Sequence, residues 1–483
     1  MSALRPAETL EDSFAPVLLA NLAPLVGVVA LGWDAAALAV LYAVEVLFSL
    51  ALAGFEALFA QRHPPEERDG VVSVGDAELI DKRGSVTVVE WLPPVYPRTV
   101  PFVAGVVTGV GWFTLFVGVV AVSTVDAGAA LARTDVLLSL AGLVVTGVGG
   151  SARRYFARRE YEEVSPYGVI ETPARRVFFL VFLVLPVAQS GGLVLLAALV
   201  VGKVAVEYSA HRADDGETGG LTGWLAGPDG GGERPEPVTV PDGDPVASFP
   251  TDRRTVLVAA SLRTLRRAAP GYAVLCFFIW VFGTAFVGGD DAPLAVVAGI
   301  TAGVVLLYFG ALAVRVGSSY LRFAPLEYRR YDDRIVAHDA WLEEPQWSVS
   351  VREMRNLNVL TDRLADRLTG TRTVRFTHGW SDDETERQIG PVADYERLVD
   401  AFELPVADTE FDPLDRRAVA AAVALAVVYA AGVVAVLLSP GLDADAVFLA
   451  VFALPFVAMF VNGIWRRSYP DRVDRSPDPS WRD

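Results

Sequence analysis

The sequence predicts an all-α, multi-pass membrane protein with about ten transmembrane helices, into which a small α+β cytoplasmic domain is inserted. Ten apolar stretches are long enough, or nearly long enough, to cross a bilayer core of about 30 Å as helices. Almost all basic residues lie on one side of the membrane that these stretches imply. The longest polar segment between two of them, residues 320–412, is large enough for a compact domain.

The apolar stretches are predicted to be helices because lipid offers no partner for backbone N–H and C=O groups. The fifth and sixth stretches are short, and Pro186 and the Gly191–Gly192 pair favour a break between them over one long helix. The ten candidate spans are Pro16–Gly32, Ala35–Phe59, Val100–Val125, Val136–Gly150, Val177–Ser190, Gly191–Val206, Tyr272–Val287, Pro293–Val314, Ala418–Leu438 and Ala446–Ile464.

Arginine placement favours a hairpin for the fifth and sixth spans. A hairpin keeps the arginines before and after it on one face, whereas a single span puts them on opposite faces and violates the positive-inside rule. Ten spans then leave both termini in the cytoplasm and the protein in the cell membrane, and Arg133 is the only basic residue in an outside loop. The arginines concerned are Arg153, Arg154, Arg158, Arg159, Arg175, Arg176, Arg212, Arg253 and Arg254.

The composition is strongly acidic, with a formal net charge of −17. Of the 41 basic residues only Lys82 and Lys203 are lysine, which is typical of a salt-adapted, halophilic archaeon; the alternative is a mesophile with acidic loops. Such acidity argues against nucleic acid as a partner. The single cysteine, Cys276, lies in a span, so no disulfide framework or thiolate metal site is expected. No cofactor motif is present, and no cofactor is predicted.

Soluble segments divide the chain into five parts. The loop 61–98 is predicted to hold a hairpin of Val71–Ile80 and Ser85–Trp91, and the Gly/Pro-rich acidic segment 213–250 is predicted to be a disordered linker. The parts are a six-helix membrane domain (1–212), the linker (213–250), an amphipathic helix with two spans (251–319), the cytoplasmic domain (320–412), and two final spans with a short tail (413–483).

The amphipathic helix is predicted over Thr251–Ala269. Val258, Leu262 and Leu265 share one face, and Arg263, Arg266 and Arg267 occupy the other. Such a helix suits the anionic inner leaflet of a membrane, or it is a plain juxtamembrane anchor for the next span.

The cytoplasmic domain carries four motif segments, Tyr331–Ile335, Arg363–Gly370, Thr373–Phe376 and Ile389–Val392. With these segments the domain resembles the bacterial pleckstrin-homology-like (PH-like) domain, a small bent sheet capped by a C-terminal helix. This resemblance implies protein or lipid contact, and it carries no catalytic residue. The predicted elements are strands at Glu327–His338, Gln346–Val351, Thr373–Thr377 and Thr385–Ile389, a short helix at Thr361–Leu368 ending at Gly370, and a last helix opened by Pro391.

The N-terminal half carries the motifs Asn21–Gly27, Gly32–Trp33, Tyr42, Glu45, Pro93–Arg98, and the series Lys203, Glu207 and His211. With these motifs it is similar to an uncharacterised multi-pass membrane family, domain of unknown function 6498, over about residues 21–212. Ala43 stands where that family usually has an aromatic residue, and Thr108–Gly109 where a histidine is expected. The family implies no established activity.

Glu45 is the main candidate for an intramembrane functional residue. It lies about 15 Å into its span, where a carboxylate is costly unless it is paired or protonated. The alternative is a structural interhelical hydrogen bond from a neutral Glu45 carboxyl, with Tyr42, one turn away, as a partner. Lys203, Glu207 and His211 share one face of the sixth span. Lys203 either reaches Glu45, which would create a charge relay, or forms an ordinary i, i+4 pair with Glu207. A metal held by Glu207 and His211 lacks a third ligand.

Three functions are compatible with this pattern. The first is a non-enzymatic membrane scaffold or interaction protein with a cytoplasmic PH-like module. The second is a small-solute or ion transporter that uses Glu45 and Lys203. The third is an intramembrane enzyme, for which the sequence offers no nucleophile and base.

Overall fold

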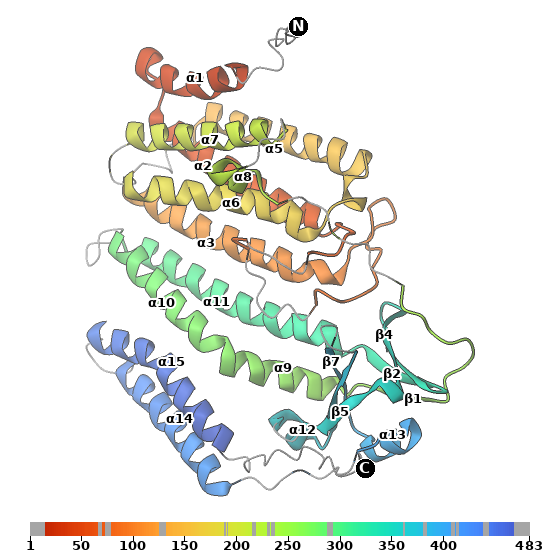
Figure 1. Cartoon of the computed structure of the whole chain (residues 1–483). Helices are drawn as coiled ribbons and strands as arrows, with labels where there is room; N and C mark the ends of the chain where they lie inside the picture. Colours follow the sequence, from red (N-terminus) through yellow and green to blue (C-terminus); the bar gives the residue numbers. More distant parts are fainter. Residues whose placement is uncertain are drawn as a thin grey trace. The chain divides into compact units, whose positions relative to one another are not determined.

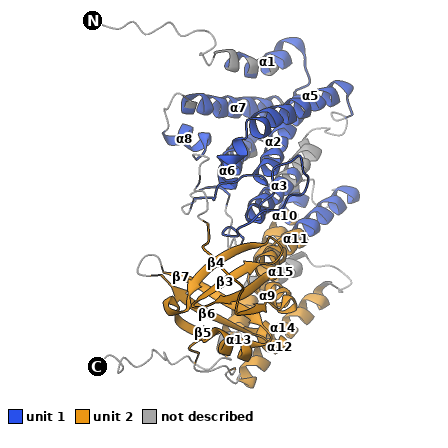
Figure 2. Ribbon diagram, turned by 90° about the vertical axis from the view of Figure 1, so that its right-hand side faces the viewer, with its two compact units in different colours: residues 1–236, 281–307 blue, residues 237–280, 308–483 orange. Residues whose placement is uncertain are grey.

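A computed structural model describes most of the chain, which divides into two compact units. The first comprises residues 1–236 and 281–307, and the second residues 237–280 and 308–483 (Figure 2). The described residues are 15–65, 70–72, 79–124, 132–187, 190, 192–214, 219–228, 232, 237–286, 293–360, 363–379, 384–406, 411, 415–437 and 444–467.

The first unit is helical, and its helix α2 (Ala35–Ala57) packs against α3, α5, α6 and α7 (Figure 1). Phe102 of α3 and Ile170 of α6 are fully buried beside α2. The other elements are α1 (Ala15–Leu31), α3 (Val100–Thr124), α5 (Thr134–Ser151) with a π-helical turn at Ala152–Ala157, α6 (Pro166–Val184), α7 (Gly192–Asp214), α8 (Gly220–Ala226), and short 3-10 turns at Pro97–Thr99, Glu160–Glu162 and Leu185–Val187.

The fifth and sixth predicted spans are separate helices that pack against each other. A 3-10 turn at Leu185–Val187 follows α6, so the break falls around Pro186, where proline interrupts helical hydrogen bonding. Gly202 of α7 lets Leu180 and Leu183 of α6 approach closely, since a Cβ atom there would lie 2.4 Å from Leu180 Cδ2.

Among the described residues, five helices are long and apolar enough to cross a membrane. The structure therefore has fewer candidate spans than the ten predicted, although α1, α3, α6, α10 (Ala269–Phe286) and α15 (Ala444–Arg467) lie at the other predicted positions. The pair of α9 (Arg253–Arg267) and α10, bent by 50°, is a sixth candidate if it is counted as one span. The five are Ala37–Ala57, Thr134–Ala157, Leu193–Ala213, Leu294–Phe323 and Arg416–Val436.

The second unit contains two small antiparallel sheets. Four strands in the order β1–β2–β3–β4 form one sheet, and β5–β6–β7 form the other. Buried Tyr328, Phe376, Leu398 and Phe402 form its core with residues from both sheets. Its strands are β1 (Ala247–Pro250), β2 (Leu326–Tyr331), β3 (Arg334–Asp339), β4 (Glu344–Ser350), β5 (Arg355–Val359), β6 (Arg372–His378) and β7 (Thr385–Val392). Its helices are α9, α12 (Leu364–Thr369), α13 (Tyr395–Phe402), α14 (Arg416–Leu437) and α15, and it shares α10 and α11 (Leu294–Phe323) with the first unit.

The strand predicted at Glu327–His338 is two strands. The chain reverses between Tyr331 and Arg334, which face each other in the register of β2 and β3. Asp332 has φ +38°, a left-handed conformation that aspartate tolerates better than most residues, and it makes the tight turn possible. The helix α12 ends as predicted at Gly370, whose φ of +74° suits glycine at a helix C-terminus.

Two other expectations differ from the structure or fall outside it. Residues 213–250, expected to be disordered throughout, contain α8 and β1, because Leu225 is buried and β1 pairs with β2. The strand expected at Val71–Ile80 lies mostly outside the described residues. For Ser85–Trp91, the described residues show only an isolated bridge between Val86 and Val95.

Candidate functional site

An ion pair links α2 to α7 inside the first unit. Lys203 Nζ lies 2.9 Å from Glu45 Oε1 and 3.0 Å from Glu45 Oε2, so the ammonium bridges both carboxylate oxygens. The same nitrogen lies 5.1 Å from the centroid of the Tyr42 ring, one turn before Glu45. Three of the residues singled out in the sequence therefore come together, from helices that are far apart in the chain.

A second polar contact joins α1 to α7. The Asn21 side-chain amide donates a hydrogen bond to Glu207 Oε2, one turn after Lys203. Asn21 is buried, with 5% of its surface exposed, so this amide needs a partner inside the unit. Lys203 and Glu207 thus have partners on two different helices. Asn21 belongs to the first motif of the N-terminal half, but the pattern alone assigns it no role.

The polar residues form a series along α7. Tyr42 lies within electrostatic range of both Glu45 and Glu207, and Arg176 of α6 lies within range of Glu207. His211 lies one turn after Glu207, in the last turn of α7. No group of three His, Cys, Asp or Glu side chains in the described part of the chain could hold a metal ion. The carboxylates of Glu45 and Glu207 face the two cations Lys203 and Arg176, so the formal charge of these four residues is balanced.

The Glu45–Lys203 pair reaches the surface of its helices. The Lys203 side chain is 28% exposed and the Glu45 side chain 40%. Lipid tails cannot solvate a carboxylate, so the Lys203 ammonium supplies the stabilisation of Glu45, and the face of the Tyr42 ring stabilises the ammonium in turn. Chemically, such a pair can pass a proton or exchange its partner for a solute ion, because both groups are ionisable and partly exposed.

A buried ion pair that the sequence pattern did not reveal lies at one end of α6. Glu171 is fully buried and accepts hydrogen bonds from Val71 N at 2.7 Å, Val72 N at 3.0 Å and Arg175 Nε at 2.7 Å. The signal available in the sequence was the i, i+4 spacing of Glu171 and Arg175, which is common on exposed helix faces and does not reveal burial. We call these two residues the α6 clamp.

The α6 clamp also explains why part of the expected linker is ordered. Arg175 Nη1 donates to Trp224 O at 3.1 Å, and its guanidinium lies 5.6 Å from the Trp224 ring centroid. Leu225, next to it in α8, is only 1% exposed. Arg175 therefore ties α8 to α6, and the burial of Leu225 shows that α8 is packed in the unit, despite the Gly-rich composition around α8.

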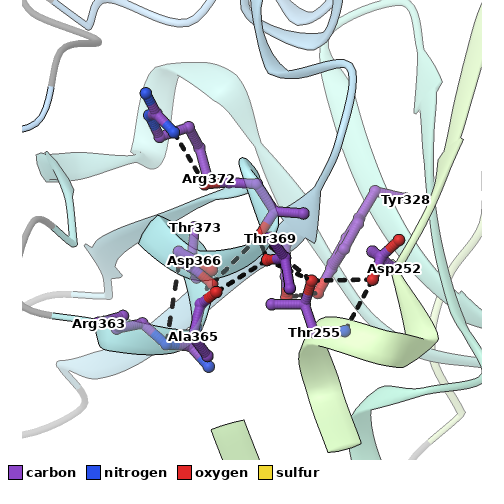
Figure 3. A network of polar contacts seen from close by, with 11 residues as sticks. Asp252, Thr255, Tyr328, Arg363, Ala365, Asp366, Thr369, Arg372 and Thr373 are labelled. Atoms are coloured by element: carbon purple, nitrogen blue, oxygen red, sulfur yellow. Dashed lines mark hydrogen bonds and ion pairs between the residues drawn. The ribbon is translucent and has the colours of Figure 1, made fainter. Parts of the chain in front are cut away.

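A polar network in the second unit joins α9 to α12 (Figure 3). Asp252 Oδ1 caps α9 by accepting from Thr255 N at 2.7 Å and from the Thr255 hydroxyl at 2.8 Å. The same hydroxyl lies 2.8 Å from the hydroxyl of Thr369 in α12. Asp366 is fully buried, and Arg363 Nε lies 4.0 Å from its Oδ2. Burial raises the pKa of the Asp366 carboxyl, although Arg363 opposes the effect.

Comparison with known proteins reaches the first unit only. Residues 3–219 match a family described as "Family of unknown function (DUF6498)", and that match contains α1 to α7 together with every residue of the Glu45–Lys203 series. No curated protein and no solved structure matches the chain.

Proposed function

We propose that the protein is a non-enzymatic, multi-pass protein of the cell membrane that holds a PH-like module at the cytoplasmic face, where the module contacts a protein or lipid partner. About ten helices cross the membrane in this proposal, and both termini are cytoplasmic. The several candidate spans of the described chain support the membrane setting.

The observation that carries the proposal is that the module is assembled from both sides of the α10–α11 helix pair. Before the pair, β1 contributes an edge strand that pairs with β2, which follows the pair. Phe249 of β1 packs edge-to-face on Phe402 of α13, with ring centroids 5.3 Å apart. Because both ends of the pair join one folded unit, the chain must leave and re-enter the module on the same side of a membrane.

The architecture of the module supports the PH-like assignment. Two antiparallel sheets are followed by α13, whose Tyr395, Leu398 and Phe402 are buried. The resemblance stated for the sequence implies a small bent sheet closed by a C-terminal helix. No catalytic residue transfers with this resemblance, and interaction is the role that we propose for the module.

Co-purification of the full chain from native membranes tests this proposal with two variants. Tyr328 is fully buried in the module core, so Tyr328→Asp should unfold the module, while Glu45→Gln changes only the membrane domain. A partner of the module should be lost with Tyr328→Asp and retained with Glu45→Gln. Equal recovery with Tyr328→Asp would overturn the proposal, as would solute flux through proteoliposomes that Glu45→Gln abolishes.

The ion pair between Glu45 and Lys203 favours a second candidate function, transport of an ion or small solute. Its support is the bidentate contact at 2.9 and 3.0 Å within the membrane domain. Proton, sodium and chloride flux into proteoliposomes should then fall with Glu45→Gln and with Lys203→Met. Val201→Ala, an exposed position two residues from Lys203, is the matched control and should leave flux unchanged. Absence of flux in the wild type for all three ions would count against this candidate.

A further inference from the structure

The helix α9 packs on the module through small and β-branched side chains, not through its leucines. Val256, Ala260 and Thr264, one turn apart, are buried, together with Thr255. Helices α9 and α12 lie against each other, with Thr255 and Thr369 in hydrogen-bond contact (Figure 3). The face that contacts the module is therefore the one that carries Val256, Ala260 and Thr264.

Two of the three leucines of α9, Leu257 and Leu265, point away from the module, whereas Leu262 is half-buried. Leu257 is 48% exposed and Leu265 is 65% exposed, with exposed Ser261 between them. Successive members of this series are four residues apart, so they form one stripe along the helix. An exposed leucine stripe on a short helix indicates a contact that the folded unit itself does not provide.

Arginines lie at both ends of the same helix. Arg253 and Arg254 begin α9, Arg266 and Arg267 end it, and all four are exposed. The helix contains no acidic residue, although the whole chain carries a net charge of −17. This local excess of positive charge is complementary to an anionic surface.

The position of α9 indicates that this anionic surface is a membrane. Only Ala268 separates α9 from α10, and the two helix axes differ by 50°, so α9 departs from the direction of the span at its start. Trp341 is 45% exposed and lies between Arg253 of α9 and Tyr320 near the end of α11. Its ring centroid is 5.5 Å from the guanidinium carbon of Arg253 and 6.1 Å from the ring centroid of Tyr320. Tryptophan and tyrosine at this level are typical of the membrane–water interface.

We infer that α9 and Trp341 form a surface for anionic lipids, on which the leucine stripe enters the headgroup layer and the four arginines bind lipid phosphates. The module lies on the opposite side of α9, so lipid composition would set how firmly the module is held at the membrane. This inference rests on the membrane setting of the proposed function and names the lipid class that this part of the protein recognises.

Depth measurements on the full chain in nanodiscs test the inference. A nitroxide spin label is placed at Ser261→Cys in a Cys276→Ser background, because Cys276 is the only native cysteine. Nanodiscs contain phosphatidylcholine alone or with phosphatidylglycerol, and the relative collision rates of oxygen and a polar nickel chelate give the depth of the label. The label should lie about 5–10 Å below the phosphates when phosphatidylglycerol is present.

Charge variants complete the test. Arg253→Gln with Arg254→Gln, or Arg266→Gln with Arg267→Gln, should return the label toward water and abolish the dependence on phosphatidylglycerol. Arg355→Gln with Arg375→Gln removes the same charge from strands β5 and β6 and should not. A label that is equally exposed to water in both lipid mixtures would overturn the inference. The partner loss expected for Tyr328→Asp does not depend on this result, so the two proposals can fail separately.

Discussion

Replacing Glu171 with glutamine tests the α6 clamp most directly. The carboxylate is fully buried and accepts three hydrogen bonds, from Val71 N, Val72 N and Arg175 Nε. Glutamine keeps the shape and one carbonyl oxygen, but it removes the charge that balances Arg175. Arg175 is only 7% exposed, so water cannot replace the lost partner.

The expected destabilisation is large for a change of one atom. Removing one partner of a buried ion pair costs about 3–5 kcal/mol, because the other charge stays buried. Arg175 keeps its bond to Trp224 O, which places the expected loss near the lower value, at about 3 kcal/mol. In the double variant Glu171→Gln with Arg175→Met no unpaired charge remains, so it should be less destabilised than the sum of the single changes.

Chemical denaturation of the full chain in detergent measures these differences. Glu162→Gln is the matched control, since Glu162 forms an exposed pair with Arg159 at 3.5 Å in the same unit and should change stability little. The reasoning is refuted if Glu171→Gln unfolds at the same denaturant concentration as Glu162→Gln. Additive effects of Glu171→Gln and Arg175→Met would refute the charge-pair account specifically.

Three further predictions concern two titratable groups outside the candidate spans and the topology of the chain. Burial and Arg98 lower the pKa of His63 to about 4, so the first unit should lose stability as pH falls from 6.5 toward 4. In denaturation experiments across this pH range, His63→Gln should reduce that loss. Asp366 has a raised pKa, so the second unit should lose stability as pH rises above about 4, and Asp366→Asn should remove that loss when unfolding is compared at pH 4 and pH 7. With Cys276→Ser, a membrane-impermeant maleimide should label Asp135→Cys on intact cells but Glu353→Cys only after permeabilisation; labelling of Glu353→Cys on intact cells would invert the topology.

The sequence pattern predicted the parts of the fold that depend on local spacing. Helices occupy the positions of the apolar stretches because any such segment in lipid must satisfy its own backbone groups. Gly370 marked the end of α12, since its conformation favours glycine. The strands β1 and β5 were missed. Strand β1 is only four residues long, and it pairs with β2, which comes after the helices α10 and α11 in the sequence.

The candidate site was predictable only in part. Glu45, Tyr42 and Lys203 stood out because polar groups are rare in spans, and the structure brings them together. Their pairing is a property of how α2 packs on α7, which no local pattern contains. Glu171 was missed for the opposite reason: a charged residue beside an arginine one turn away is ordinary on a surface, and burial arises only from the loop that covers it.

The split of the module around α10 and α11 also sets the order of events during synthesis. Strand β1 and helix α9 leave the ribosome before the helix pair, whereas β2, the strand that pairs with β1, leaves after it. In the proposed topology, the sheet cannot close until both helices have been inserted and the chain has returned to the same side. Until then Phe249 lacks the core in which it is buried, so a failed insertion leaves an unfinished domain with exposed apolar surface, which quality-control proteases can recognise.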